Sequence, residues 1–147
     1  MKVDLEINNV AKIPIRSYFF VSITEKTLRK SGCGFLKRKK ISLSLAIVRK
    51  AEIKKLNKTY RKKNETTDIL SFAEYKNIQE IKAAKGKELF LGELILCYDD
   101  IKEYAKRRGL VLKKELAIVF VHGLLHLLGF RHGKKMFEIQ NKVVNIQ

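Results

Sequence analysis

The stretch HGLLHLLGFRH, residues 122–132, organises the rest of the chain. It holds all three histidines, and the residues from 116 to 128 are almost all apolar. An apolar run of this kind predicts a largely buried helix that carries His122 and His126. Because these two residues are four positions apart, their imidazoles lie on one helical face, where both can bind the same metal ion.

A turn after this helix is predicted to add the third histidine. Gly129 can end the helix in a left-handed turn, so that the chain returns His132 to the point where His122 and His126 converge. Three imidazoles in this arrangement predict a zinc site, with one ion per chain and an open fourth position. The alternative is that the histidines are hydrogen-bonded core residues. Three buried imidazoles without partners would each cost stability, which favours metal binding.

The spacing H-x-x-x-H-x-x-G-x-x-H is that of metzincin peptidases, with one difference. Gly123 occupies the position of the glutamate that activates zinc-bound water in those enzymes. The metal ligands remain, but a peptidase would lack its proton acceptor. A zinc peptidase stays open as a less favoured alternative.

The same stretch resembles the H-G-x-L-H-L-x-G-[YF]-D-H signature of the YbeY family, bacterial endoribonucleases that act in ribosomal RNA maturation and quality control. Residues 56–61, LNKTYR, and 67–72, TDILSF, are similar to the family's L-N-x-x-Y-R and T-D-V-L-S-F. Residues 91–94, LGEL, are similar to its L-G-[DE]-I. One position departs, because Arg131 stands where the family usually has aspartate. The resemblance implies an endoribonuclease whose partner is ribosomal RNA or a ribosomal subunit.

The charge of the chain also predicts a nucleic-acid partner. It has 32 lysine and arginine residues against 15 aspartate and glutamate residues, a formal net charge of +17. The basic residues concentrate in residues 37–40, 49–63 and 106–108, although a solvated basic surface without a partner is the alternative. Single-stranded RNA fits a basic cleft in which Tyr60 and Phe72 offer aromatic faces for stacking, but their pattern favours packing both in the core.

Arg61, at the end of a predicted basic helix, is the candidate catalytic residue. A zinc ion held by three neutral imidazoles can lower the pKa of its bound water to about 7. Attack on a phosphodiester then develops negative charge on oxygens that an arginine fork can stabilise. In the resembled family, the matching arginine is important for activity. The alternative is that Arg61 is one more solvent-exposed cation.

The residue that accepts the proton stays open. Asp68 and Glu93 are the nearest candidates by motif, but each can equally cap a turn or pair with a lysine. A different class of function also stays open, in which zinc only stabilises a non-catalytic module that binds RNA or the ribosome. In that module Arg61 would bind phosphate without accelerating a reaction.

The periodicity of the apolar residues predicts an α+β fold in one domain over residues 1–147. We expect a small mixed sheet of about four strands, packed with about five helices around the central apolar metal-binding helix, a zincin-like arrangement. The predicted strands lie near residues 3–7, 41–47, 69–73 and 89–96, and the predicted helices near residues 15–31, 53–61, 99–108, 113–128 and 136–146. Residues 74–88 are predicted to form a loop, with room for a short helical turn, that can cover the site.

The sequence predicts a cytoplasmic protein without a membrane span. Residues 1–6 contain acids where a signal peptide needs an apolar run, and the apolar run near residues 116–130 is too short to cross a bilayer. Cys33 and Cys97 form no CxxC pair, which favours free thiols over a metal site or a disulfide. The oligomeric state cannot be read from the pattern.

Overall fold

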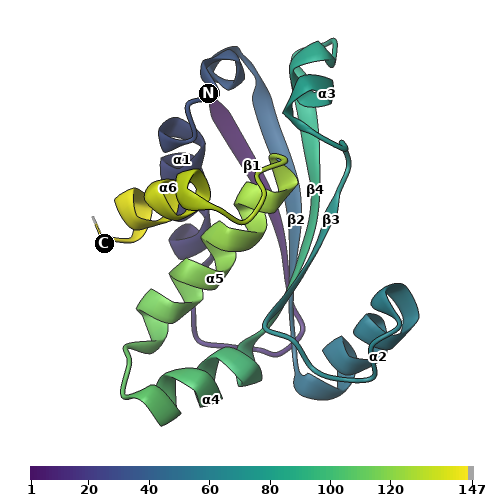
Figure 1. Cartoon of the computed structure of the whole chain (residues 1–147), viewed down its shortest axis with the longest axis vertical. Helices are drawn as coiled ribbons and strands as arrows, with labels where there is room; N and C mark the ends of the chain where they lie inside the picture. The colour runs from purple at the N-terminus through teal and green to yellow at the C-terminus, as the bar shows by residue number, and fades with distance from the viewer. Residues whose placement is uncertain (146–147) are drawn as a thin grey trace.

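The computed structural model of the protein describes residues 1–145 (Figure 1). The elements in chain order are β1 (Lys2–Asn9), α1 (Ser17–Lys30), the 3-10 helix η1 (Gly34–Arg38), β2 (Lys40–Val48), α2 (Lys50–Arg61), β3 (Ile69–Ala73), α3 (Ile78–Ala83), β4 (Glu88–Cys97), α4 (Tyr98–Arg108), α5 (Leu112–Leu127) and α6 (Lys134–Val144). The predicted α+β class is confirmed. The expectation of about five helices was too low by one, because α3 forms within the predicted loop.

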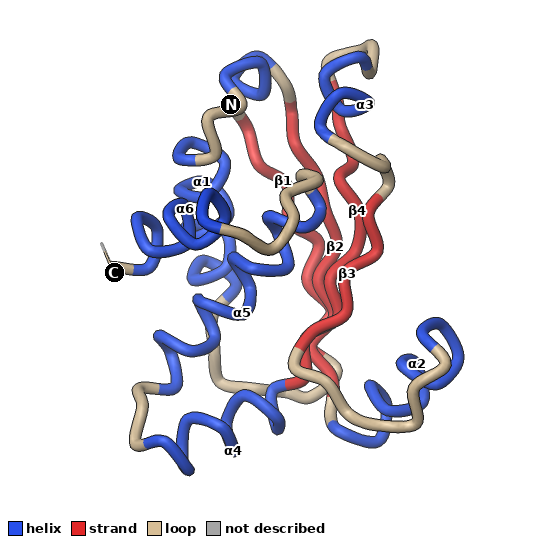
Figure 2. The backbone as a smooth tube through the Cα atoms, in the orientation of Figure 1, coloured by secondary structure: helices blue, strands red, loops and turns tan. Residues whose placement is uncertain are grey.

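The four strands form one mixed sheet in the order β1-β2-β4-β3 (Figure 2). The strands β1, β2 and β4 are parallel neighbours, and β3 pairs antiparallel with β4. This order makes β3 an edge strand of the sheet. The backbone of β3 therefore has a free side that side chains from other elements can reach.

One face of the sheet carries the main hydrophobic core. The alternating residues Ile41, Leu43, Leu45 and Ile47 of β2 are all buried in it, as their two-residue period predicts. The helices α1, α5 and α6 lie together on this side of the sheet (Figure 1). The predicted metal-binding helix, α5, is thus held in the largest apolar cluster of the molecule.

The helix α2 lies on the opposite side of the sheet (Figure 1). It contributes Ile53 to a smaller cluster that also contains Leu70, Ile95 and Cys97. Alternate residues of β4, such as Leu94 and Leu96, belong to the main core instead. Both faces of the sheet are therefore covered at this end, which explains why residues 94–97 form a continuous apolar run.

A glycine allows α5 to approach the sheet closely. A Cβ atom at Gly123 would lie 2.6 Å from Cδ1 of Ile69 and 3.0 Å from Cδ2 of Leu94. The position that holds glutamate in metzincins therefore faces β3 and β4 here, and a longer side chain would have to displace Ile69 and Leu94. Gly92 serves a similar purpose in β4, since a Cβ atom there would lie 2.2 Å from the carbonyl oxygen of Phe72.

The C-terminal helix α6 closes the main core. Met136, Ile139 and Val143 are buried at helical spacing, as predicted, whereas Ile146 lies outside the described residues. Within residues 1–145, no helix has the length and apolar character that a membrane crossing requires.

Candidate metal centre

The three histidines converge at one point of the structure. His122 and His126 lie one turn apart on α5, and their Nε2 atoms are 3.1 Å apart. His132 follows in the segment before α6, and one ring nitrogen of each histidine lies within 4.8 Å of the others. The three residues could hold one metal ion, as their spacing predicts.

The turn that returns His132 begins where α5 ends. Gly129 has a φ angle of +90°, so the predicted left-handed turn is confirmed. Its amide donates to the carbonyl oxygen of His126 at 3.0 Å, and the amide of Phe130 donates to that of Leu125 at 3.0 Å. These bonds satisfy the last carbonyl groups of the helix and reverse the chain.

The hydrogen bonding of His126 fits a metal ligand. Its Nδ1 lies 3.0 Å from the carbonyl oxygen of Phe130, which can only accept, so Nδ1 carries the proton. The lone pair is then on Nε2, the atom that faces Nε2 of His122. A backbone carbonyl that sets the tautomer in this way is common for histidines that bind metals. The donor set of the three residues therefore fits a cation such as zinc.

The environment of His122 favours the neutral imidazole that a metal requires. Burial lowers the pKa of His122, and the nearby His126 and His132 lower it further because a second positive charge would be repelled. Asp68 and Gln140 act in the opposite direction. Because the net pKa is below the ordinary histidine value, His122 is neutral and able to bind a cation at pH 7.

Gln140 is a site residue that the sequence pattern did not reveal. It lies on α6 and is only 9% exposed, and within residues 1–145 its buried Oε1 has no hydrogen-bond partner. The influence of Gln140 on the pKa of His122 indicates that its amide group lies near that imidazole. An amide oxygen there is suited to orient the ring of a metal ligand. The sequence did contain one sign of this role, because Gln140 is a polar residue on the otherwise apolar stripe of α6.

Arg61 reaches the histidines from the other side of the sheet. Its Nη2 donates to the carbonyl oxygen of Ser71 in the edge strand β3, at 2.8 Å. Its guanidinium carbon lies 5.0 Å from the ring centroid of Phe72. Arg61, Asp68, His122 and His126 line the same cavity, of about 300 Å³. The structure therefore brings the predicted catalytic residue and two of the predicted metal ligands together.

The chain leaves α2 directly after Arg61. Lys62 has a φ angle of +58°, and its amide donates to the carbonyl oxygen of Asn57, so the helix stops there. The buried side chain of Asn57 donates to the carbonyl oxygen of Glu65 at 3.0 Å. This bond ties the returning loop to the helix. The conformation that presents Arg61 is therefore fixed by its immediate neighbours.

The prediction that Tyr60 packs in the core was wrong. The residue is 61% exposed. Its ring contacts that of Phe72 edge-on, with a centroid distance of 5.5 Å. The inward stripe of α2 ends earlier, at the buried Ile53 and the partly buried Leu56. The last turn of α2 therefore carries an exposed aromatic ring beside Arg61.

The two candidate proton acceptors differ in position. Asp68 lines the cavity that contains Arg61 and the histidines. Its backbone is held because its carbonyl oxygen accepts from the amide of Cys97 at 2.8 Å. Glu93 is exposed on β4, opposite Phe72, and does not line this cavity. The arrangement favours Asp68 over Glu93.

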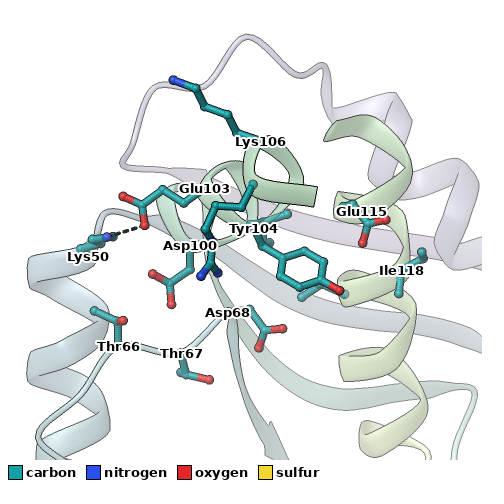
Figure 3. Close-up of a pocket in the computed structure, with 13 residues that line it drawn as sticks. Lys50, Thr66, Thr67, Asp68, Asp100, Glu103, Tyr104, Lys106, Glu115 and Ile118 are labelled. Atoms are coloured by element: carbon teal, nitrogen blue, oxygen red, sulfur yellow. Dashed lines mark ion pairs between the residues drawn. The ribbon is translucent and has the colours of Figure 1, made fainter. Parts of the chain in front are cut away.

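Asp68 also borders a second, larger cavity of about 950 Å³ between α2, α4 and α5 (Figure 3). Its lining is rich in carboxylates, which include Asp100 and Glu115, and Glu103 pairs with Lys50. Asp100 is half-buried, and this burial raises the pKa of its carboxyl group. The second cavity also contains the cations Lys50, Lys106 and Arg107, so its lining carries charges of both signs.

Arg131, the departure from the resembled signature, is exposed. Among the described residues it forms no ion pair that would compensate its charge. Its neighbour His132 is exposed as well. A positive charge thus lies next to the outermost of the three histidines.

The chain is similar to known proteins over most of its length. A family model described as Endoribonuclease YbeY matches residues 6–146. A Staphylococcus saprophyticus protein named Endoribonuclease YbeY is 38% identical over 108 residues, which cover 70% of each chain. A protein of the same name from Staphylococcus aureus strain JH9 is 38% identical over 110 residues, with the same coverage.

A solved structure also resembles this chain. The solution structure of TM1509 from Thermotoga maritima superimposes with a TM-score of 0.64 and 26% sequence identity. The match covers 97% of this chain and 87% of that protein. From the family match and the relatives together, we conclude that the chain belongs to the YbeY endoribonuclease family.

Proposed function

We propose that this protein is a zinc-dependent endoribonuclease that cleaves single-stranded RNA. Membership in the family supports an RNA-cleaving role. The observation that carries the proposal is the cavity that Arg61 shares with His122 and His126. We further propose that residues 1–147 act as one hydrolase domain, in the cytoplasm, in the maturation and quality control of ribosomal RNA.

In this proposal His122, His126 and His132 bind one zinc ion. When bound, zinc supplies a Lewis acid and lowers the pKa of a coordinated water molecule. The carbonyl oxygen of Phe130 keeps the proton of His126 on Nδ1, away from the metal. Burial keeps His122 neutral, because it lowers the pKa of that residue.

Arg61 has the role of binding the scissile phosphate and stabilising the charge that develops on its oxygens. Its hydrogen bond to Ser71 and its contact with Phe72 restrain the side chain, so little reorganisation is needed when the substrate arrives. The guanidinium has five N–H donors, and the bond to Ser71 uses one of them. The remaining donors are available to phosphate oxygens. Asp68, in the same cavity, is the proposed proton acceptor.

Two other functions compete with this proposal. A zinc peptidase is disfavoured, because Gly123 supplies no carboxylate at the position of the glutamate of that class and packs against Ile69 and Leu94. A non-catalytic RNA-binding module is more difficult to separate from a nuclease. Such a module would keep the zinc and the basic surface but would have no need for Arg61 and Asp68 in the histidine cavity.

A cleavage assay on zinc-loaded and metal-stripped protein separates the three functions. We expect the zinc-loaded protein to cleave single-stranded RNA, to spare duplex RNA of the same sequence and to leave casein intact. Removal of zinc should abolish cleavage, and added zinc should restore it. Binding of RNA without cleavage under both conditions would contradict the proposal in favour of the module.

The substrate assignment has its own test. Isolated ribosomal subunits and deproteinised ribosomal RNA are compared as substrates with an unrelated single-stranded RNA of equal length. Higher kcat/KM for the ribosomal substrates would support a role in ribosomal RNA maturation. Equal rates on all three would restrict the function to general single-strand cleavage.

A further inference from the structure

We infer that Tyr60 and Phe72 form a stacking subsite for one unpaired nucleobase of the substrate, next to the phosphate that Arg61 binds. This inference rests on the proposed function and specifies how the protein holds the substrate strand. It would make Tyr60 a determinant of single-strand specificity. Three observations on the described residues support it: the exposure of Tyr60, its contact with Phe72, and the contact of Phe72 with Arg61.

The first observation is that Tyr60 is largely exposed to solvent. The side chain is on the last turn of α2, and 61% of the residue surface is accessible. Single exposed aromatic side chains are common on protein surfaces, so this exposure establishes only that the ring is accessible to a ligand. A tyrosine can contact a base with its ring face while its hydroxyl group stays in water.

The second observation is the edge-on contact between Tyr60 and Phe72. The ring centroids are 5.5 Å apart with an interplanar angle of 73°. This contact holds the edge of one ring against the other and leaves ring surface of Tyr60 open to solvent. Phe72 is in the edge strand β3 and packs against the small cluster under α2, so it gives the exposed ring a fixed support.

The third observation is that Arg61 shares this support. Its guanidinium carbon lies 5.0 Å from the ring centroid of Phe72, and Arg61 lines the cavity of His122 and His126. A base bound at Tyr60 and a phosphate bound at Arg61 would therefore lie at two side chains that both contact Phe72. Proteins that bind single strands combine these two features, because bases stack on aromatic rings while phosphates meet cations.

The charges around the subsite favour nucleic acid over an apolar protein partner. Lysines flank it on the exposed surface of α2 and in the turn that follows: Lys54, Lys55, Lys58, Lys62 and Lys63. A strand of RNA would thus be guided along α2 toward the histidines.

A stacking subsite would explain a preference for single strands in physical terms. A base that pairs in a duplex already stacks on its neighbours, and its face is free only after it leaves the helix. The exposed ring of Tyr60 could accept a base from a flexible strand without this cost. Duplex RNA could still contact the lysines of α2, but it would bind without placing a phosphate at Arg61.

The test replaces Tyr60 in the full-length, zinc-loaded protein and measures cleavage of oligoadenylate. We expect Tyr60→Ala to raise KM about tenfold, because stacking of one base on an aromatic ring contributes about that much to affinity. Tyr60→Phe should keep KM close to that of the wild type, since the ring is retained. Tyr18→Ala is the matched control, because Tyr18 is an exposed tyrosine on α1.

A binding measurement makes the outcome independent of turnover. The probe is an oligoadenylate with a single 2-aminopurine, whose fluorescence falls when the base stacks, followed by stopped flow before cleavage proceeds. Several probes place the reporter at successive positions. We expect at least one position to be quenched by the wild type and by Tyr60→Phe, and to lose that quenching with Tyr60→Ala.

The outcomes distinguish the inference from the proposed function. Unchanged KM and unchanged quenching with Tyr60→Ala would overturn the stacking subsite, while cleavage by the wild type would leave the nuclease intact. A wild type that quenches the probe but does not cleave RNA would refute the proposed function. In that case loss of quenching with Tyr60→Ala would still support a base-binding site. An equal loss of quenching, or an equal rise in KM, with Tyr18→Ala would also count against the inference.

Discussion

The two faces of the sheet contribute to the candidate site in different ways. On one face, α5 is packed into the main core through fully buried residues such as Leu124 and Leu125, and it carries the half-buried His122 and His126. On the other face, α2 rests on a cluster of few residues and exposes Arg61 at its end. The histidines are therefore held by dense packing, and the arginine by a few specific contacts.

This difference indicates a division of roles. A metal site needs ligands whose positions vary little, and a buried helix provides this. A residue that contacts the substrate must be accessible, and the end of an exposed helix provides that. Changes on the α5 face should therefore affect metal content, and changes on the α2 face should affect catalysis at unchanged metal content. The following predictions test this division.

The largest effect is expected for His126→Ala on the α5 face. The purified wild type should contain about one zinc per chain, and the variant should contain little, because two ligands rarely hold zinc against competition. Cleavage of RNA should then fall to background. Elemental analysis of both proteins checks this, with Asn141→Ala as a control on the exposed surface of α6. Equal zinc in wild type and variant would rule out the histidine site.

Arg61 provides the matching test on the α2 face. Arg61→Ala should lower kcat by about 10²–10³, the usual effect of removing one donor that acts on transition-state charge. Arg61→Lys should also be impaired, because an ammonium group does not reproduce the planar fork. Zinc content should stay at the wild-type level in both.

The control for Arg61 is Lys58→Ala, which removes an exposed cation from the same helix. We expect it to weaken RNA binding slightly and to reduce the salt dependence of binding, with normal kcat. If Arg61→Ala behaved like Lys58→Ala, with a raised KM alone, Arg61 would be a binding residue and its catalytic role would be wrong.

A smaller effect is expected when the support of α2 is weakened. Ile53 is the fully buried residue by which α2 packs on the sheet. Ile53→Ala should lower the free energy of unfolding by about 2–5 kcal/mol. Cys97 of the same cluster reports the change, because burial raises its pKa to about 11 and leaves almost no reactive thiolate at pH 8. Alkylation of Cys97 should therefore be slow in the wild type and faster in the variant.

Peptide mapping after alkylation separates Cys97 from Cys33, which lies in the main core. The variant should increase labelling of Cys97 more than labelling of Cys33. Its zinc content should stay normal and its kcat should fall, since Arg61 depends on α2. Parallel increases at both cysteines would show that the two faces unfold together, and the division of roles would not hold.

The smallest effect is expected at Arg131. Arg131→Asp replaces a positive charge beside His132 with a carboxylate, which should attract the metal and slow zinc loss by about tenfold at most. Competition with a chelator measures this rate. Arg131→Gln separates removal of the cation from addition of the acid. Identical zinc release from all three proteins would mean that the position tolerates any of these residues.

Much of this arrangement follows from short-range sequence patterns. The spacing within residues 122–132 predicts which imidazoles share a helical face and where the chain turns back, because both depend on local backbone geometry. The alternation of apolar residues in β2 predicts a strand and its buried face for the same reason. These predictions concern residues that lie a few positions apart, and the structure agrees with them.

Other features depend on which distant segments meet. Gln140 lies on a helix that packs against α5, and Arg61 reaches the histidine cavity around the edge strand β3. The exposure of Tyr60 was mispredicted because its helical position alone suggested packing, whereas the last turn of α2 extends beyond the small cluster. Local periodicity indicates which residues share a face of one element. The partner of that face is decided by the order of the strands and by the packing of helices on both sides of the sheet.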